Sequence, residues 1–173
     1  MSTLSSINNF LQALRGTNPT TIPDPNPPPT LKNKWIIITG SNNGIGLETS
    51  KLLAKWGANL ILACRQQEQT PPWETSPESA VEICRDLALE HGHSTSTIEA
   101  WVLDLADFGS VEAFARRWVA TGRCLDVLVN NAGVAGDNGE GDVTGDGIRV
   151  IYQVCFLFSL LAGLMCAILS QVH

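Results

Sequence analysis

A glycine-rich segment that directly follows a short apolar run has the residue types and spacing of a phosphate-binding turn. Residues 39–46 read TGSNNGIG, and residues 35–38 before them read WIII. Where a buried strand turns sharply into a helix, the free amide groups at the start of that helix can face a phosphate. Gly40 permits the turn, Gly44 lets main chain approach a pyrophosphate, and Gly46 lets helix and strand pack closely. The segment therefore predicts a dinucleotide site whose binding residues include Gly40, Ser41, Asn43, Gly44, Ile45 and Gly46.

The elements that would position this turn alternate along the chain from residue 31. Apolar runs predict strands at 35–39, 59–63, 98–103 and 125–130, and amphipathic patterns predict helices at 44–56, 77–90 and 110–120. Strands that are apolar on both faces belong to a parallel sheet covered by helices on both sides. With right-handed crossovers the expected fold is α/β, a doubly wound parallel sheet of Rossmann type. We expect it to be incomplete, with strand order 3-2-1-4 and the ligand at the carboxyl ends of the strands.

Three motifs together give the chain a family resemblance. The glycine pattern of 39–46, Asp-Leu at 104–105 and Asn-Asn-Ala-Gly at 130–133 resemble the short-chain dehydrogenase/reductase family. Leu-Glu-Thr at 47–49 and Ala-Cys-Arg at 63–65 are similar to its retinol dehydrogenase and WW-domain oxidoreductase branch. The resemblance implies an NADP(H)-dependent oxidoreductase that acts on a hydroxyl/carbonyl pair of an apolar alcohol or aldehyde.

The resemblance also implies roles for residues beyond the glycine turn. The Asp104 carboxylate is expected to meet the adenine amino group, and Leu105 to border the adenine ring. Asn130 is expected to tie the fourth strand to its neighbours. Ala132 and Gly133 should let the main chain pass close to the ribose of the cofactor. The further cofactor-binding residues are therefore Asp104, Leu105, Asn131, Ala132 and Gly133.

Cofactor choice depends on the residue at the end of the second predicted strand. A carboxylate there binds the ribose 2′-hydroxyl of NAD, whereas a cation accepts the 2′-phosphate of NADP. Arg65 occupies this place, and residues 62–67 contain neither Asp nor Glu. A guanidinium can bind a phosphate through two hydrogen bonds. The sequence therefore predicts that NADP is the cofactor, in preference to NAD, and that Arg65 binds it; a merely solvated arginine is the alternative.

The catalytic residues of the family are absent from this sequence. Its members use a Tyr as proton donor or acceptor and a Lys four residues later, because a phenol with a pKa of about 10 needs a nearby cation to act as a base near neutral pH. The one tyrosine, Tyr152, is followed four residues later by Phe156, and the last lysine is Lys55. Cys155 stands where the branch has Asn. No residue is therefore assigned to catalysis.

Two classes of function remain open at this point. The first is an NADP(H)-dependent oxidoreductase present in a truncated, inactive form that keeps the nucleotide-binding half. The second is a non-catalytic protein that binds NADP(H) or associates with full-length relatives, unless the chain is an artefact of gene prediction. A Tyr-x-x-x-Lys motif encoded in the genome beyond Gln153 would distinguish these alternatives.

Composition divides the chain into three parts. Residues 1–30 form an arm with a proline-rich connector, residues 31–153 the partial NADP-binding domain, and residues 154–173 an apolar tail. No charged residue lies in 150–172, a stretch long enough to span a bilayer as a helix of roughly 20 residues. Three interpretations compete: a fifth helix of the sheet domain, translated intron after Gln153, or a membrane tail anchor.

The net charge and the cysteine pattern restrict the binding partners and the cellular compartment that we expect for the protein. The net charge of −6 without a cluster of basic residues argues against nucleic-acid binding. Five scattered cysteines without a C-x-x-C pair, and an amino terminus without the pattern of a signal peptide, predict a cytoplasmic protein, with a tail-anchored membrane protein as the alternative. His91 and His93 have no further ligands at suitable spacing, so no metal site is expected. A nicotinamide dinucleotide is the expected partner.

Overall fold

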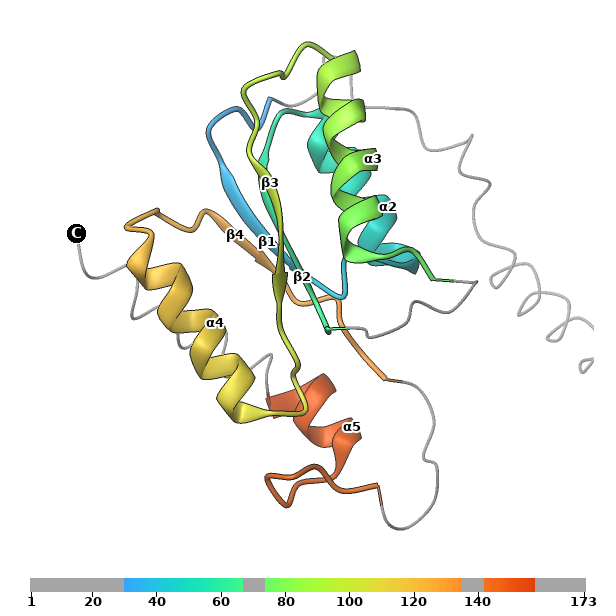
Figure 1. The fold of residues 1–173 in the computed structure, drawn as a ribbon, viewed down its shortest axis with the longest axis vertical. Coiled ribbons are helices and arrows are strands. Elements are labelled where there is room, and N and C mark those ends of the chain that lie inside the picture. Colours follow the sequence, from blue (N-terminus) through green and yellow to red (C-terminus); the bar gives the residue numbers. More distant parts are fainter. Residues whose placement is uncertain (1–29, 67–73, 135–141, 158–173) are drawn as a thin grey trace, which may run out of the picture.

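The computed structural model of the chain describes residues 30–66, 74–134 and 142–157 (Figure 1). Three predicted parts lie mainly outside the described residues: residues 1–29 of the arm and connector at 1–30, most of the insert between the second strand and its helix, and the tail after residue 157. The interpretation of the tail as a fifth helix, intron or anchor therefore depends mainly on residues that the structure does not describe.

Strands and helices alternate as the sequence predicts, and most boundaries agree within one or two residues. The fourth strand is shorter than the predicted 125–130, and the helix predicted from residue 110 begins two residues earlier because Asp107 caps it, accepting a hydrogen bond from Gly109 N. The elements are β1 (Trp35–Thr39), α2 (Gly44–Lys55), β2 (Asn59–Cys64), α3 (Pro77–Glu90), β3 (Ile98–Val102), α4 (Phe108–Ala120), β4 (Val127–Val129), α5 (Val150–Tyr152) and a π-helical turn (Gln153–Leu157).

The four strands form one parallel sheet in the order β3-β2-β1-β4. Trp35 pairs with Asn59 of β2, and Ile36 pairs with Val127 of β4. The crossover after β1 leads to β2 on one side of it, whereas the crossover after β3 leads to β4 on the other side. The carboxyl end of β1 therefore lies at the topological switch point, where ligands bind in such sheets. The predicted fold class and strand order are confirmed.

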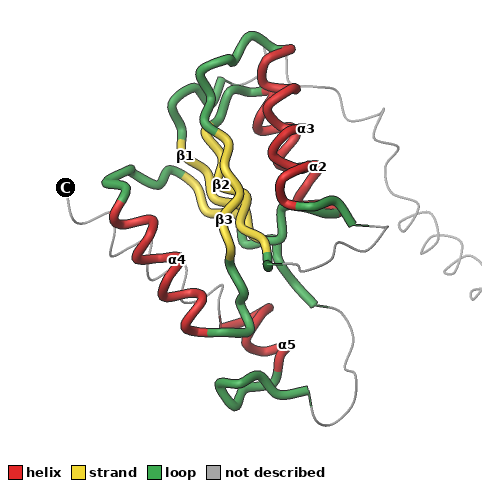
Figure 2. Tube along the Cα trace, viewed as in Figure 1, coloured by secondary structure: helices red, strands yellow, loops and turns green. Residues whose placement is uncertain are grey.

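Alternate residues of the central strands build two separate cores. Ile36 and Ile38 pack in a cluster with residues of α2 and α3, whereas Ile37 packs in a second cluster with Trp101 and Trp118. Figure 2 shows α2 and α3 on one side of the sheet and α4 on the other. Because both faces of β1 and β2 are buried, these strands are apolar at successive positions, which is the pattern that identified them.

The last described segment is helical. α5 and the π-helical turn continue one another over residues 150–157, and Val154 is buried in the second core cluster. This is the region in which a fifth helix was expected to start. Among the described residues, no helix reaches the length and apolarity that a membrane crossing requires.

Candidate dinucleotide site

The glycine turn between β1 and α2 has the backbone geometry that its glycines predict. Gly40 (φ +63°) and Gly44 (φ +52°) both lie in the left-handed region, where residues with a Cβ are strained. Between them, Asn43 caps α2, and its side-chain oxygen accepts a hydrogen bond from Gly44 N at 2.8 Å. The turn is tied to the sheet by Gly40 N, which donates to Ala63 O at 2.9 Å.

Gly46 is needed for close packing. A Cβ on this residue would lie 2.1 Å from Gly40 O and 2.5 Å from Asn131 Nδ2. No real Cβ approaches backbone so closely, so the first turn of α2 can contact the end of β1 only through glycine. The structural role predicted for this glycine is confirmed by its geometry.

Gly44, unlike Gly46, has open space where a side chain would lie. A Cβ on Gly44 would meet no atom within 4 Å, because the residue borders open space in a cavity. The first turn of α2 contains no acidic side chain. The first turn of α2 and the positive end of its helix dipole thus lie at the cavity wall, which suits an anion.

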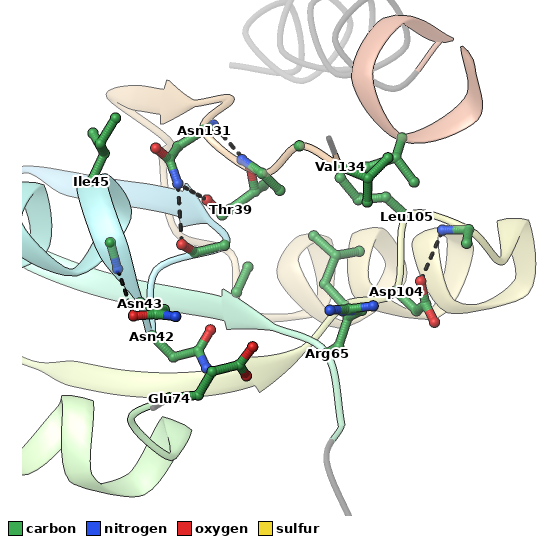
Figure 3. Close-up of a pocket in the computed structure, with 18 of the residues that line it drawn as sticks. Thr39, Asn42, Asn43, Ile45, Arg65, Glu74, Asp104, Leu105, Asn131 and Val134 are labelled. Atoms are coloured by element: carbon green, nitrogen blue, oxygen red, sulfur yellow. Dashed lines mark hydrogen bonds between the residues drawn. The ribbon is translucent and has the colours of Figure 1, made fainter. Parts of the chain in front are cut away.

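The cavity has a volume of about 400 Å³ and lies at the carboxyl ends of the strands (Figure 3). It joins the glycine turn to the ends of β2, β3 and β4 and to α5. The predicted binding residues that line it are Gly40, Asn43, Gly44, Ile45, Arg65, Asp104, Leu105, Asn131, Ala132 and Gly133.

Ser41 and Gly46 are the two predicted residues that do not line this cavity. Ser41 is fully buried, and its Oγ lies 3.4 Å from Cys64 Sγ. Burial raises the pKa of the Cys64 thiol, and the contact with Ser41 lowers it in part. The pair is therefore a neutral contact that holds the turn against β2. Contact of Ser41 with a cofactor remains a prediction.

Thr39, which the sequence did not single out, organises the end of β1. Its Oγ1 accepts hydrogen bonds from Asn131 N at 3.1 Å and Ala132 N at 2.9 Å, and it can donate to Val129 O at 3.4 Å. Asn131 Nδ2 donates in turn to Thr39 O at 3.0 Å and to Gly40 O at 3.1 Å. These bonds fix the segment after β4 beside the glycine turn.

The tie between the fourth strand and its neighbour therefore belongs to Asn131, and its assignment to Asn130 was wrong by one residue. β4 ends at Val129, and Asn130 is exposed. One residue further along, Asn131 is half-buried against β1 and makes the bonds. The physical reason is the alternation of side chains beyond the end of a strand, because a shift of one residue reverses the side to which a side chain points.

Replacing the hydroxyl of Thr39 should weaken this junction measurably. In a Thr39→Val variant the nearly isosteric side chain leaves Ala132 N without its acceptor, and we expect a loss of about 2 kcal/mol in the free energy of unfolding. Thr39→Ser keeps the hydroxyl and is the control. Urea unfolding followed by circular dichroism measures both; equal midpoints for the two variants would show that the hydroxyl contributes nothing.

The side of the cavity lined by Asp104 and Leu105 is shaped by a turn before α4. Asp104 Oδ1 accepts from Ala106 N at 2.9 Å, and Asp104 N donates to Ser110 Oγ at 2.9 Å. One carboxylate oxygen thus holds the turn itself. Leu105 is buried beside it, with its neighbours Leu103 and Ala106 also lining the cavity. The contact between Asp104 and an adenine amino group stays a prediction.

The cavity wall formed by Val150 and Val154 is held in place by Gln153, which is fully buried. Its Oε1 accepts from Thr144 Oγ1 at 2.6 Å, and its Nε2 donates to Asp146 Oδ2 at 2.7 Å. Asp146 Oδ2 also accepts from Phe108 N at 3.0 Å, at the start of α4. This network keeps Val150 and Val154 at the cavity. The sequence offered no signal for this network.

The residues next to Gln153 include two at which the sequence departs from the family that it resembles. Cys155 Sγ accepts a hydrogen bond from Val134 N at 3.4 Å, in the segment that follows β4. Tyr152 is exposed over 58% of its surface and does not line the cavity.

Comparisons with known proteins agree with this geometry. The short chain dehydrogenase family profile matches residues 34–162, so the chain belongs to this family of oxidoreductases. Human retinol dehydrogenase 13 is 38% identical over 105 residues, covering 61% of this chain and 28% of that protein. The WW domain-containing oxidoreductase of Danio rerio is 38% identical over 127 residues, covering 73% of this chain and 27% of that protein. The predicted family is confirmed.

Solved structures show the same fold. A short chain dehydrogenase from Mycobacterium smegmatis has a TM-score of 0.57 at 25% identity, covering 82% of this chain and 53% of that chain. A short-chain dehydrogenase from Sphingobium yanoikuyae, solved in complex with NADPH, has a TM-score of 0.59 at 24% identity, covering 78% and 47%. The chain thus spans about half of these solved chains and little more than a quarter of the curated relatives named above.

Proposed function

We propose that the cavity binds NADP(H). The pyrophosphate would lie at the amino end of α2, against the backbone of Gly44 and Ile45. The adenosine would lie between Arg65 and Asp104, and the nicotinamide ribose along residues 131–133. The observation that carries this proposal is the open space at Gly44, where bare backbone at a helix start faces a cavity.

The position of Arg65 supports NADP(H) over NAD(H). Arg65 follows the last residue of β2, is exposed, and lines the cavity at the place where a cation accepts a 2′-phosphate. The short-chain dehydrogenase of Sphingobium yanoikuyae, which shares the fold, was solved with NADPH. A charge-assisted bond from this guanidinium would strengthen binding of the phosphorylated cofactor.

The chemistry associated with such a site is hydride transfer at a hydroxyl/carbonyl pair. We propose that the 173 residues form the nucleotide-binding half of an enzyme for that reaction and do not catalyse the reaction by themselves. The family's proton donor is a phenol whose pKa is lowered by a nearby cation, yet Tyr152 does not line the cavity and Phe156 follows where a Lys would be. The chain belongs to an oxidoreductase family, but its own residues support cofactor binding alone.

A second candidate is a non-catalytic dinucleotide-binding protein that associates with longer relatives. β4 is the end strand of the described sheet, and Val127 within it is exposed over 45% of its surface. An end strand with apolar side chains favours association with another chain.

Titration of NADPH and NADH against the wild type and Arg65→Glu tests the cofactor proposal. We expect the variant to bind NADPH more weakly by about 1.5 to 3 kcal/mol, or roughly ten- to 150-fold, because a charge-assisted contact is replaced by repulsion. NADH affinity should change little. Arg116→Glu, on the exposed face of α4, gives the same change in net charge away from the cavity. Equal affinities of the wild type for NADPH and NADH would overturn the proposed preference.

A further inference from the structure

A carboxylate shares the cavity with Arg65 although residues 62–67 contain neither Asp nor Glu. Glu74 lines the same cavity, nine residues after Arg65 and just before α3. In the view of Figure 3, Arg65 lies between Glu74 and Asp104. Among the residues that the structure describes, the Arg65 cation and the carboxylates of Glu74 and Asp104 thus line this end of the cavity.

Hydrogen bonds hold the backbone next to Glu74 in place. Asn42 Nδ2, in the glycine turn, donates to Thr75 O at 2.9 Å. Ser76 caps α3, and its Oγ accepts from Ser79 N at 3.1 Å. Glu74 is half-buried, so its side chain lies against the protein and does not extend freely into solvent. Residues 74–76 are therefore held between the glycine turn and α3, and this position brings Glu74 to the cavity wall.

The chemistry of a carboxylate at this wall opposes that of Arg65. A carboxylate accepts hydrogen bonds from ribose hydroxyls, which favours NAD(H), and it repels a 2′-phosphate, which disfavours NADP(H). Asn42, which holds the segment, comes from the same turn that would bind the pyrophosphate. The carboxylate would therefore act at the ribose end of the same ligand.

We propose that Glu74 is a specificity-determining residue that narrows the preference for NADP(H) by opposing the 2′-phosphate and accepting a hydrogen bond from the 2′-hydroxyl of NAD(H). This inference rests on the proposed binding of a nicotinamide dinucleotide in the cavity. Arg65 favours the phosphorylated ligand, Glu74 limits that preference, and removal of the Glu74 charge should increase it.

Binding of 2′-phospho-ADP-ribose and ADP-ribose to the full chain tests the proposal without any chemistry at the nicotinamide. In Glu74→Gln, affinity for 2′-phospho-ADP-ribose should rise about tenfold, because one repulsion between unit charges at a partly solvated site is removed. The affinity of the same variant for ADP-ribose should stay equal or fall. Glu74→Asp keeps the charge and should not show the gain. The gain should shrink as salt concentration rises.

Glu90→Gln is the matched control, because it removes one negative charge at the far end of α3, outside the cavity lining. A gain for 2′-phospho-ADP-ribose in Glu74→Gln, and in neither control variant, would support the proposal. An unchanged ratio of the two affinities in Glu74→Gln would overturn it and leave the dinucleotide site intact. If the wild type bound neither ligand, the proposed function would fail together with the inference.

Discussion

Gly46→Ala is expected to prevent the chain from folding stably. The added Cβ would lie 2.1 Å from the backbone atom Gly40 O and 2.5 Å from Asn131 Nδ2, a side-chain end that two hydrogen bonds to the backbone hold in place. Either α2 must shift away from the sheet or the bonds from Asn131 to β1 must break. Overpacking of this kind costs about 3 kcal/mol or more, a large part of the total stability of a small domain. Urea unfolding, followed by the fluorescence of buried Trp101 and Trp118, measures the loss.

Gly92→Ala separates this steric effect from the general cost of replacing a glycine. Gly92 has φ +81°, and a Cβ there would meet no atom within 4 Å. Its replacement should cost about 1 kcal/mol from backbone strain alone. If Gly46→Ala unfolded at the same urea concentration as Gly92→Ala, the close approach of α2 to β1 would not be essential to the fold.

Local patterns predicted the turn and the sheet because their causes are local. Successive apolar residues in β1 and β2 reflect strands that are buried on both faces, and the glycines at 40, 44 and 46 reflect a turn with positive φ and a close contact. Each of these features is a requirement on a residue type at one position. A sequence therefore shows them directly.

Contacts between distant segments could not be predicted in the same way. Glu74 reaches the cavity because Asn42 binds Thr75, 33 residues away, and Gln153 holds the cavity wall through Thr144 and Asp146. An ordinary Glu in a polar loop and an ordinary Gln give no sign of such partners. Their placement depends on how the sheet brings strand ends together, which periodicity does not specify.

The error at Asn130 has a related cause. Two consecutive asparagines follow the fourth strand, and the sequence does not say which of them points toward β1. β4 is three residues long and ends at Val129, so Asn131 makes the bonds to Thr39 and Gly40. Boundaries of short strands are the weakest part of a pattern-based prediction, because a shift of one residue exchanges the two sides of the strand.

The second large effect concerns catalysis. We expect the purified 173-residue chain to bind NADPH without oxidising it in the presence of aldehydes or ketones. Positioned acid–base catalysis contributes about 10²- to 10⁴-fold to such reactions, and it requires a proton donor within hydrogen-bond reach of the substrate oxygen. Tyr152 is exposed outside the cavity lining, Phe156 follows it at the place of the family's Lys, and Cys155 replaces the Asn of the branch. The cavity would therefore hold a cofactor without the protein side chains that transfer the proton.

Absorbance of NADPH at increasing concentrations of the chain, with a panel of aldehydes and ketones, measures this directly. Gly44→Val is the control for a reaction that depends on the site, since a β-branched side chain at φ +52° is strained and fills the open space where the pyrophosphate would lie. We expect wild type and Gly44→Val to give the same rate as buffer, while NADPH binding is lost in the variant alone. Turnover by the wild type that Gly44→Val abolishes would show that the described cavity is a working active site and that another group supplies the proton.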